Sequence, residues 1–209
     1  MNNSYKLQQR TEQNDFAGVV YGLLGSCIWG SYMAVSSQGV ADGFSAEDLA
    51  FLRYLTSGLL LLPLLALSNM FRKVGWQRSV VLTLLAGPVF AVLAVHGFIY
   101  APLIHGTVIQ ALSLILSCLL LVLWRCKEKP KFSYLFGLFV LFIGLAAVSG
   151  PLLPSQVNSS ELWKGDLLFV AAGVMWALFM TLIWYWQVDA LAVTVVVAVL
   201  SALIYCPLY

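Results

Sequence analysis

The chain alternates long apolar stretches with short polar connections. Most of these stretches reach about 18 residues, the length at which a helix crosses the ~30 Å hydrocarbon layer of a membrane at ~1.5 Å per residue. We therefore predict an all-α fold, a polytopic membrane helix bundle. The predicted helices cover Phe16–Ser36, Glu47–Leu67, Ser79–Leu103, Thr107–Trp124, Phe132–Ser149, Gly165–Trp186 and a stretch from Asp189 that is still apolar at Tyr209.

Short local patterns indicate where these helices begin, bend and end. Ser45 and Asp48 have the spacing of a capping box, which predicts a helix start. The pair Gly87–Pro88 predicts a kink, because proline has no N–H to donate and its ring crowds the preceding turn. We expect a basic loop over Asn69–Arg78 and a very short turn at Ile104–Gly106.

Composition agrees with a membrane location. Hydrophobic residues make up 61% of the 209 positions and charged residues 10%, with a mean hydropathy of +0.91, whereas a soluble domain carries roughly 25% charge. The net charge of +2 is too small to indicate nucleic-acid binding. The four cysteines have no metal-type spacing and are interpreted as packing thiols. The first 15 residues are too polar to contain the apolar part of a cleaved signal peptide.

One helix pattern occurs twice. Gly18–Met33 and Gly165–Met180 align without a gap at an offset of 147 residues, which matches Trp29 with Trp176. The alternative is that two unrelated apolar helices share common residues by chance. We favour a repeat, since internal repeats of membrane helices are typical of transporters. The predicted organisation is a cytoplasmic tail (1–15), a complete five-helix repeat (16–150), an extracytoplasmic linker (151–164) and the start of a second repeat (165–209).

The positions of the charges predict the orientation. Nine of the eleven basic residues lie in the tail or in the connections after the second and fourth helices, which places the amino terminus in the cytoplasm. The other connections hold most of the acids, including Glu47 and Asp166. Because five helices is an odd number, the second repeat would be inverted relative to the first. The basic residues concerned are Lys6, Arg10, Arg72, Lys73, Arg78, Arg125, Lys127, Lys129 and Lys131.

Several short motifs resemble the EamA domain of the drug/metabolite transporter superfamily. They are Ile28-Trp29-Gly30-Ser31, Phe51-Leu52-Arg53-Tyr54, Tyr100-Ala101 with Leu103, Lys127-Glu128-Lys129, Gly137 with Gly144, and Gly165-Asp166-Leu167-Leu168 with Trp176. The resemblance implies ten helices in two inverted repeats and a permease or exporter of amino acids, metabolites or drugs. It also implies a cell membrane, in the first place a bacterial inner membrane.

The chain departs from that family pattern at two places. The proline expected in the fourth helix is absent, and the region Ser113–Ser117 occupies its position. The sequence also stops before the last three helices of the pattern. We expect a truncated product or a partial reading frame, whose open repeat interface favours pairing with a second copy or with a partner that supplies the missing helices.

Candidate substrate-binding residues lie in the outer parts of the predicted helices. Counting ~1.5 Å per residue places Arg53, His96, Gln110 and Trp29 roughly 5 to 10 Å below the outer helix ends. Trp176 is the counterpart of Trp29 in the second half, and a stripe of hydroxyl residues accompanies Gln110 and either lines the cavity or bonds neighbouring helices. We name Trp29, Tyr32, Arg53, His96, Gln110 and Trp176 as substrate-binding candidates.

Each candidate also has a structural interpretation. Arg53 could hold an anionic or zwitterionic group, or it could reach outward or pair with an acid of the first connection. His96 titrates near neutral pH and is suited to proton coupling, while a neutral histidine bonded inside the bundle is the commoner case. The tryptophans could flank the substrate or pack between repeats. We expect His105 to lie in an outer turn, exposed to solvent.

No enzyme is indicated by the sequence. A nucleophile paired with a base, a phosphate-binding glycine loop and a metal-ligand cluster are all missing from the pattern, so we predict no catalytic residues, no metal and no cofactor. The expected partners are the lipid bilayer and a small-molecule substrate. The remaining alternative is a membrane protein that does not transport and acts only as a structural or assembly partner.

Overall fold

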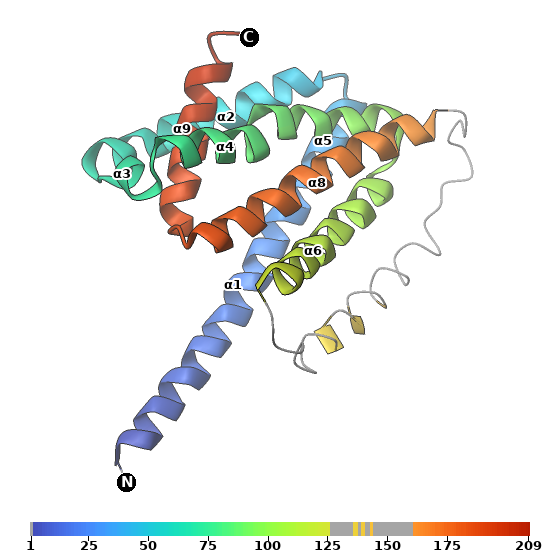
Figure 1. The fold of residues 1–209 in the computed structure, drawn as a ribbon. Helices are drawn as coiled ribbons and strands as arrows, with labels where there is room; N and C mark the ends of the chain where they lie inside the picture. Colours follow the sequence, from blue (N-terminus) through green and yellow to red (C-terminus); the bar gives the residue numbers. More distant parts are fainter. Residues whose placement is uncertain (1, 126–135, 138, 141–142, 144–160) are drawn as a thin grey trace. The chain divides into compact units, whose positions relative to one another are not determined.

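The computed structural model describes residues 2–125, 136–137, 139–140, 143 and 161–209, and over these ranges the chain is helical without a strand (Figure 1). Four of its helices are long and apolar enough to cross a membrane: Gly18–Ala41, Ala46–Leu67, Trp76–Tyr100 and Leu162–Trp186. The predicted fold class is therefore confirmed: this is an all-α membrane helix bundle. The chain divides into two compact units, Met1–Ser36 and Ser37–Tyr209.

The first unit is formed by most of α1 (Asn2–Ala41). The prediction placed this helix at Phe16–Ser36, and both of its bounds were wrong. Hydropathy identifies only the apolar part of a helix, so it did not indicate that α1 begins among the polar residues before Phe16. The polar segment before Phe16 is rich in Lys, Gln, Glu and Arg, which favour helix when no breaker intervenes.

The second unit contains the remaining helices. In it, α8 contacts both α5 and α6, while α9 packs against α2, α3 and α4, and α2 also contacts α5 (Figure 1). The helices are α2 (Ala46–Leu67), α3 (Met70–Val74), α4 (Trp76–Ala86), α5 (Pro88–Tyr100), α6 (Leu103–Arg125), α8 (Leu162–Trp186) and α9 (Ala190–Tyr205).

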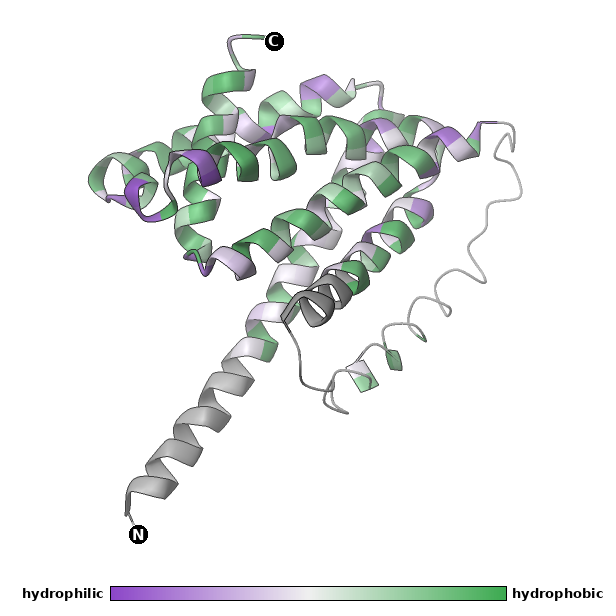
Figure 2. Ribbon diagram, in the orientation of Figure 1, coloured by the Kyte–Doolittle hydropathy of each residue, from purple (hydrophilic) through white to green (hydrophobic). Residues whose placement is uncertain are grey.

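The core of this second unit lies where α9 crosses its neighbours. Val193, Val195 and Val196 of α9 are buried together with Leu82 of α4. Small residues bring the backbones close: a methyl group on Gly58 of α2 would lie 2.4 Å from Ala202 of α9. Apolar residues dominate the helices of this unit (Figure 2), and many large apolar side chains are exposed, as on a surface that faces lipid and has no need of polar groups.

Two predicted local signals are confirmed. The N–H of Asp48 donates to Ser45 Oγ at 3.0 Å, and the N–H of Ser45 donates to Asp48 Oδ2 at 3.0 Å, which completes the capping box of α2. The pair Gly87–Pro88 separates α4 from α5, and Pro88 takes the first position of α5. At this position its missing N–H is tolerated because the first N–H groups of a helix have no partner within the helix.

Two predicted connections were wrong. The segment Asn69–Arg78 is not a loop, since it contains all of α3 and the start of α4, with a turn at Gly75, where φ is +85°. The segment Ile104–Gly106 already belongs to α6, and the turn lies at Ala101–Pro102. A residue before proline avoids the helical region, which explains the extended conformation of Ala101 at the end of α5.

Some predictions for the second half of the chain are confirmed, and others fall on residues outside the described ranges. The last part of α8 ends at Trp186 as predicted, and Asp189 caps α9 by accepting a hydrogen bond from Ala192 N at 2.9 Å. The predicted helix Phe132–Ser149 lies outside the described residues except at five positions. The linker predicted over 151–164 is described only from Glu161 onward.

Candidate functional site

Arg53 lies on α2 beside a buried tyrosine. Its guanidinium carbon is 5.3 Å from the centre of the Tyr54 ring, a distance at which a cation is attracted to an aromatic face. The Tyr54 hydroxyl donates a buried hydrogen bond of 3.0 Å to the carbonyl oxygen of Ala86 at the end of α4. The half-buried arginine is thus placed on a helix that is anchored to the α4–α5 break.

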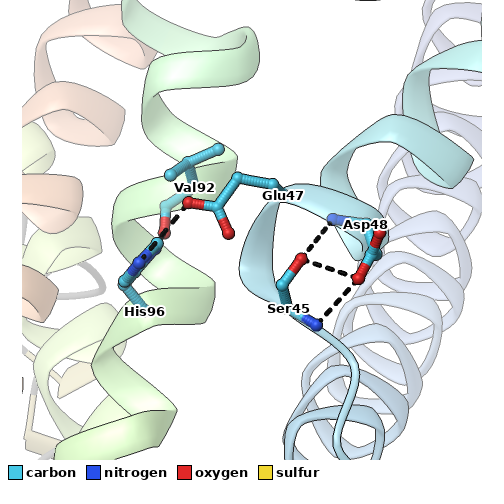
Figure 3. A network of polar contacts seen from close by, with 5 residues as sticks. All are labelled: Ser45, Glu47, Asp48, Val92 and His96. Carbon is cyan, nitrogen blue, oxygen red and sulfur yellow. Dashed lines mark hydrogen bonds and ion pairs between the residues drawn. The ribbon is translucent and has the colours of Figure 1, made fainter. Parts of the chain in front are cut away.

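His96 of α5 lies opposite the first turn of α2 (Figure 3). Its Nε2 is 3.5 Å from Glu47 Oε1, and its Nδ1 is 3.2 Å from the carbonyl oxygen of Val92 on its own helix. The imidazole and the carboxylate are both partly exposed. The two ring nitrogens of His96 therefore face oxygens from two different helices, α2 and α5.

The carboxylate next to Glu47 has a different role. Asp48 closes the capping box with Ser45, and its other oxygen accepts a hydrogen bond from the hydroxyl of Tyr209 (Figure 3 shows the cap). That hydrogen bond raises the pKa of Tyr209, because the carboxylate stabilises the protonated phenol.

A second histidine–carboxylate pair joins α6 to α8. Nδ1 of His105 is 2.7 Å from Oδ1 of Asp166, and both side chains are partly buried. The prediction that His105 is a solvated turn residue was therefore wrong. A sequence pattern cannot show a contact between residues 61 positions apart, although both had been assigned to the same side of the membrane.

Gln110 is the buried amide of α6. The residue is 8% exposed, and its Nε2 has no hydrogen-bond partner among the described residues. The hydroxyls of its stripe, by contrast, bond their own helix: Thr107 donates to Ile104 O at 2.9 Å, Ser113 to Gln110 O at 2.6 Å and Ser117 to Ser113 O at 2.8 Å. The stripe therefore offers one uncommitted donor, the Gln110 amide.

The two tryptophans that the sequence alignment paired, Trp29 and Trp176, lie in different units. In the first unit, the rings of Trp29 and Tyr32 are 5.5 Å apart on α1. In the second unit, Trp176 is partly buried between Phe90 and Phe179, with both ring distances 5.2 Å. These contacts fit the packing alternative for Trp176.

The candidates in the second unit fall on two pairs of adjacent helices. Arg53 and His96 lie on α2 and α5, while Gln110 and Trp176 lie on α6 and α8. The printed sequence gave no role to Glu47 or Asp166 beyond a count of outer acids, yet they contact the two histidines. The sequence signal that linked these two acids to the histidines was their predicted placement on the same side of the membrane.

The described residues contain no group of three or more His, Cys, Asp or Glu side chains that could hold a metal ion. Comparison with protein-family models adds the deciding observation. The model of the EamA-like transporter family matches residues 16–150. The chain belongs to the EamA-like transporter family. The family is one of multi-pass membrane transporters of the drug/metabolite type.

The match to the EamA-like family includes five of the six candidate residues, and only Trp176 lies beyond it. Searches among curated proteins and among solved structures gave no match.

Proposed function

We propose that this EamA-family chain carries small metabolites, amino acids or drugs across a membrane by alternating access, as a secondary transporter and not as an enzyme. The match over residues 16–150 supports transport. The observation that carries the choice of site is the buried Gln110 amide, whose Nε2 has no partner in the described part of the chain. A buried donor without an acceptor costs free energy, and a substrate oxygen would remove that cost.

Arg53 is the second proposed substrate contact. Its charge is permanent, so it favours an anionic or zwitterionic substrate. Trp176, in the same unit as Arg53 and Gln110, would offer an aromatic face to the organic part of such a substrate, and Trp29 with Tyr32 is a separate aromatic candidate within the first unit. This proposal places the positive charge on α2 and the amide donor on α6.

The proposed orientation has the amino terminus in the cytoplasm, with a bacterial inner membrane as the location. The basic residues on the proposed inner side support it. The second half, from Gly165, would be inverted relative to the first.

Proton coupling is the proposed energy source. His96 has a carboxylate partner in Glu47, at 3.5 Å, on a neighbouring helix. Among the described residues, Asp48, Tyr205 and Tyr209 are further titratable groups at this end of α2. Both tyrosines interact with Glu47 and Asp48. Protonation and release of His96 would change the contact between α2 and α5.

Flux measurements in proteoliposomes test the transport proposal. A panel of amino acids, anionic metabolites and cationic drugs should give uptake of an anionic or zwitterionic member. Gln110→Leu and Arg53→Ala should reduce that uptake at least tenfold, while the exposed controls Gln77→Leu and Arg72→Ala should leave it unchanged. Insertion without any flux would favour a structural or assembly role instead.

The coupling proposal needs a separate readout. His96→Gln should flatten the pH dependence of uptake while keeping substrate affinity, because only the titrating group is lost. An unchanged pH profile in that variant would assign His96 to helix contact alone.

A further inference from the structure

The helix interruption at Gly87 lies in the middle of the membrane-spanning stretch Trp76–Tyr100. Pro88 has no N–H, so the carbonyl of Leu84 lacks the donor that a continuous helix would supply. The carbonyl of Thr83 accepts the Gly87 N–H at 2.8 Å and keeps a second lone pair. Of these two residues Thr83 is buried and Leu84 is exposed, so it is the Thr83 main-chain oxygen that lies inside the bundle.

Two buried hydroxyl groups are found in the same region of the second unit. Thr83 on α4 is 3% exposed and Ser201 on α9 is fully buried, and neither hydroxyl oxygen has a hydrogen-bond partner among the described residues. A methyl group on Gly87 would lie 2.2 Å from the Thr83 carbonyl oxygen and 2.8 Å from Ser201 Oγ. The serine oxygen and the carbonyl oxygen thus approach one point beside Gly87.

These unpaired hydroxyls differ from others in the same unit. Ser79 donates to Gly75 O at 2.8 Å and Thr181 donates to Ala177 O at 2.7 Å, each bonding a carbonyl one turn earlier in its own helix. Both are as buried as Thr83 and Ser201. A helical serine or threonine normally has this local bond available, so the hydroxyls of Thr83 and Ser201 point elsewhere.

We propose that the Gly87 break binds a monovalent cation, Na⁺, through Ser201 Oγ, Thr83 Oγ1 and the main-chain oxygen of Thr83. All these ligands are neutral oxygens, and α4, α5 and α9 contain no acidic residue. Sites for Ca²⁺ and Mg²⁺ are built around carboxylates, so a divalent ion does not fit. The close packing at Gly87 favours Na⁺ over the larger K⁺.

The electrostatics of an interrupted helix support the same ion. The carbonyl oxygens at the carboxyl end of α4 carry partial negative charge, which favours a cation. Exposed carbonyls at broken membrane helices coordinate Na⁺ in transporters because no water is present to satisfy them. The bound ion would also supply the missing partner for both hydroxyls.

The test measures binding by the purified full chain in detergent, without any substrate. Binding of radioactive ²²Na⁺, displaced by unlabelled NaCl but not by KCl or choline chloride, is the expected result. NaCl should also raise the melting temperature relative to the same concentration of choline chloride. Absence of Na⁺-specific binding in the wild-type chain would overturn the proposal, and the two hydroxyls would then be assigned to hydrogen bonds with water.

Matched variants locate the site. Ser201→Ala and Thr83→Val should each weaken apparent Na⁺ affinity at least about tenfold, a change of about 1.4 kcal/mol. The controls Ser79→Ala and Thr181→Val remove equally buried hydroxyls and should keep wild-type affinity. Wild-type binding in Ser201→Ala and Thr83→Val would overturn the assignment.

The wild-type measurement decides the matter even where a variant does not fold. Because no substrate is used, Na⁺ binding and solute flux can fail independently. A chain that transports solute but does not bind Na⁺ would support the transport proposal and overturn the Na⁺ site. A chain that binds Na⁺ but gives no solute flux would support the Na⁺ site and overturn the transport proposal.

Discussion

Two glycine contacts in the second unit serve opposite purposes. At the contact of α5 with α8, a methyl group on Gly97 would lie 2.4 to 2.7 Å from three carbon atoms of the Phe169 ring. At the α4–α5 break, a methyl group on Gly87 would meet oxygens instead. The first glycine makes room for an apolar ring, while the second brings polar groups together. The identity of the neighbouring atoms, and not the glycine itself, separates packing from a candidate binding site.

The largest expected effect comes from Gly87→Ala. The new methyl group would be 2.2 Å from a main-chain oxygen, so a helix and not a side chain would have to move. We expect a loss of at least about 3 kcal/mol in the free energy of unfolding, toward the upper end for overpacked cores. Unfolding in mixed detergent and SDS measures it. A stable Gly87→Ala chain would show that the break is not close-packed.

Gly97→Ala should lower the free energy of unfolding by a smaller amount, about 1 to 3 kcal/mol, because the added methyl group overpacks against an aromatic ring. Phe169→Leu in the same chain should recover part of that loss, since it removes ring atoms that the methyl group meets. The double-mutant cycle on unfolding free energies gives the coupling. Ser201→Ala should not rescue Gly87→Ala in the same way, because the clash with the Thr83 carbonyl remains. Equal rescue at both glycines would remove the distinction between them.

Tyr54→Phe tests the support of the α4–α5 break from α2. The Tyr54 hydroxyl bonds the Ala86 carbonyl in a buried contact, and its loss leaves that oxygen without this donor. The expected cost is about 1 to 3 kcal/mol in unfolding free energy. The same substitution at the exposed Tyr21 is the control and should change little. A neutral Tyr54→Phe would mean that the Ala86 carbonyl finds another donor.

The smallest expected effect is a contrast between two serines. In Na⁺-free solution Ser79→Ala should cost about 0.5 to 1.5 kcal/mol, because it breaks a hydrogen bond. Ser201→Ala should cost nothing or stabilise slightly, since its hydroxyl has no partner in the described structure. Melting temperatures in choline chloride compare them. A Ser201→Ala chain that is the less stable of the two would indicate a hydrogen bond that remains to be located.

Local patterns predicted the local structure well. The capping box at Ser45 and Asp48, the break at Gly87–Pro88 and the start of the last helix near Asp189 all depend on residues within one helical turn. The membrane bundle itself followed from apolar length. Errors arose where polar residues form helix without an apolar signal, as in the segment before Phe16.

The candidate site was predictable only in part. Arg53, His96 and Gln110 attracted attention as polar residues within apolar helices, but their neighbours come from other helices. The contacts of His96 with Glu47 and of His105 with Asp166 depend on how helices pack. Ser201 looked unremarkable in the sequence because most helical serines bond their own backbone; only the structure shows that this one does not.

The two consecutive acids at the start of α2 have separate duties. Asp48 holds the cap, whereas Glu47 faces the imidazole on α5 (Figure 3). The interhelical contact and the hydrogen bonds that begin the helix are therefore made by different side chains. A change at Glu47 alters the contact with α5 and leaves the bonds of the first turn in place, so the two helices can separate at this corner without unwinding α2.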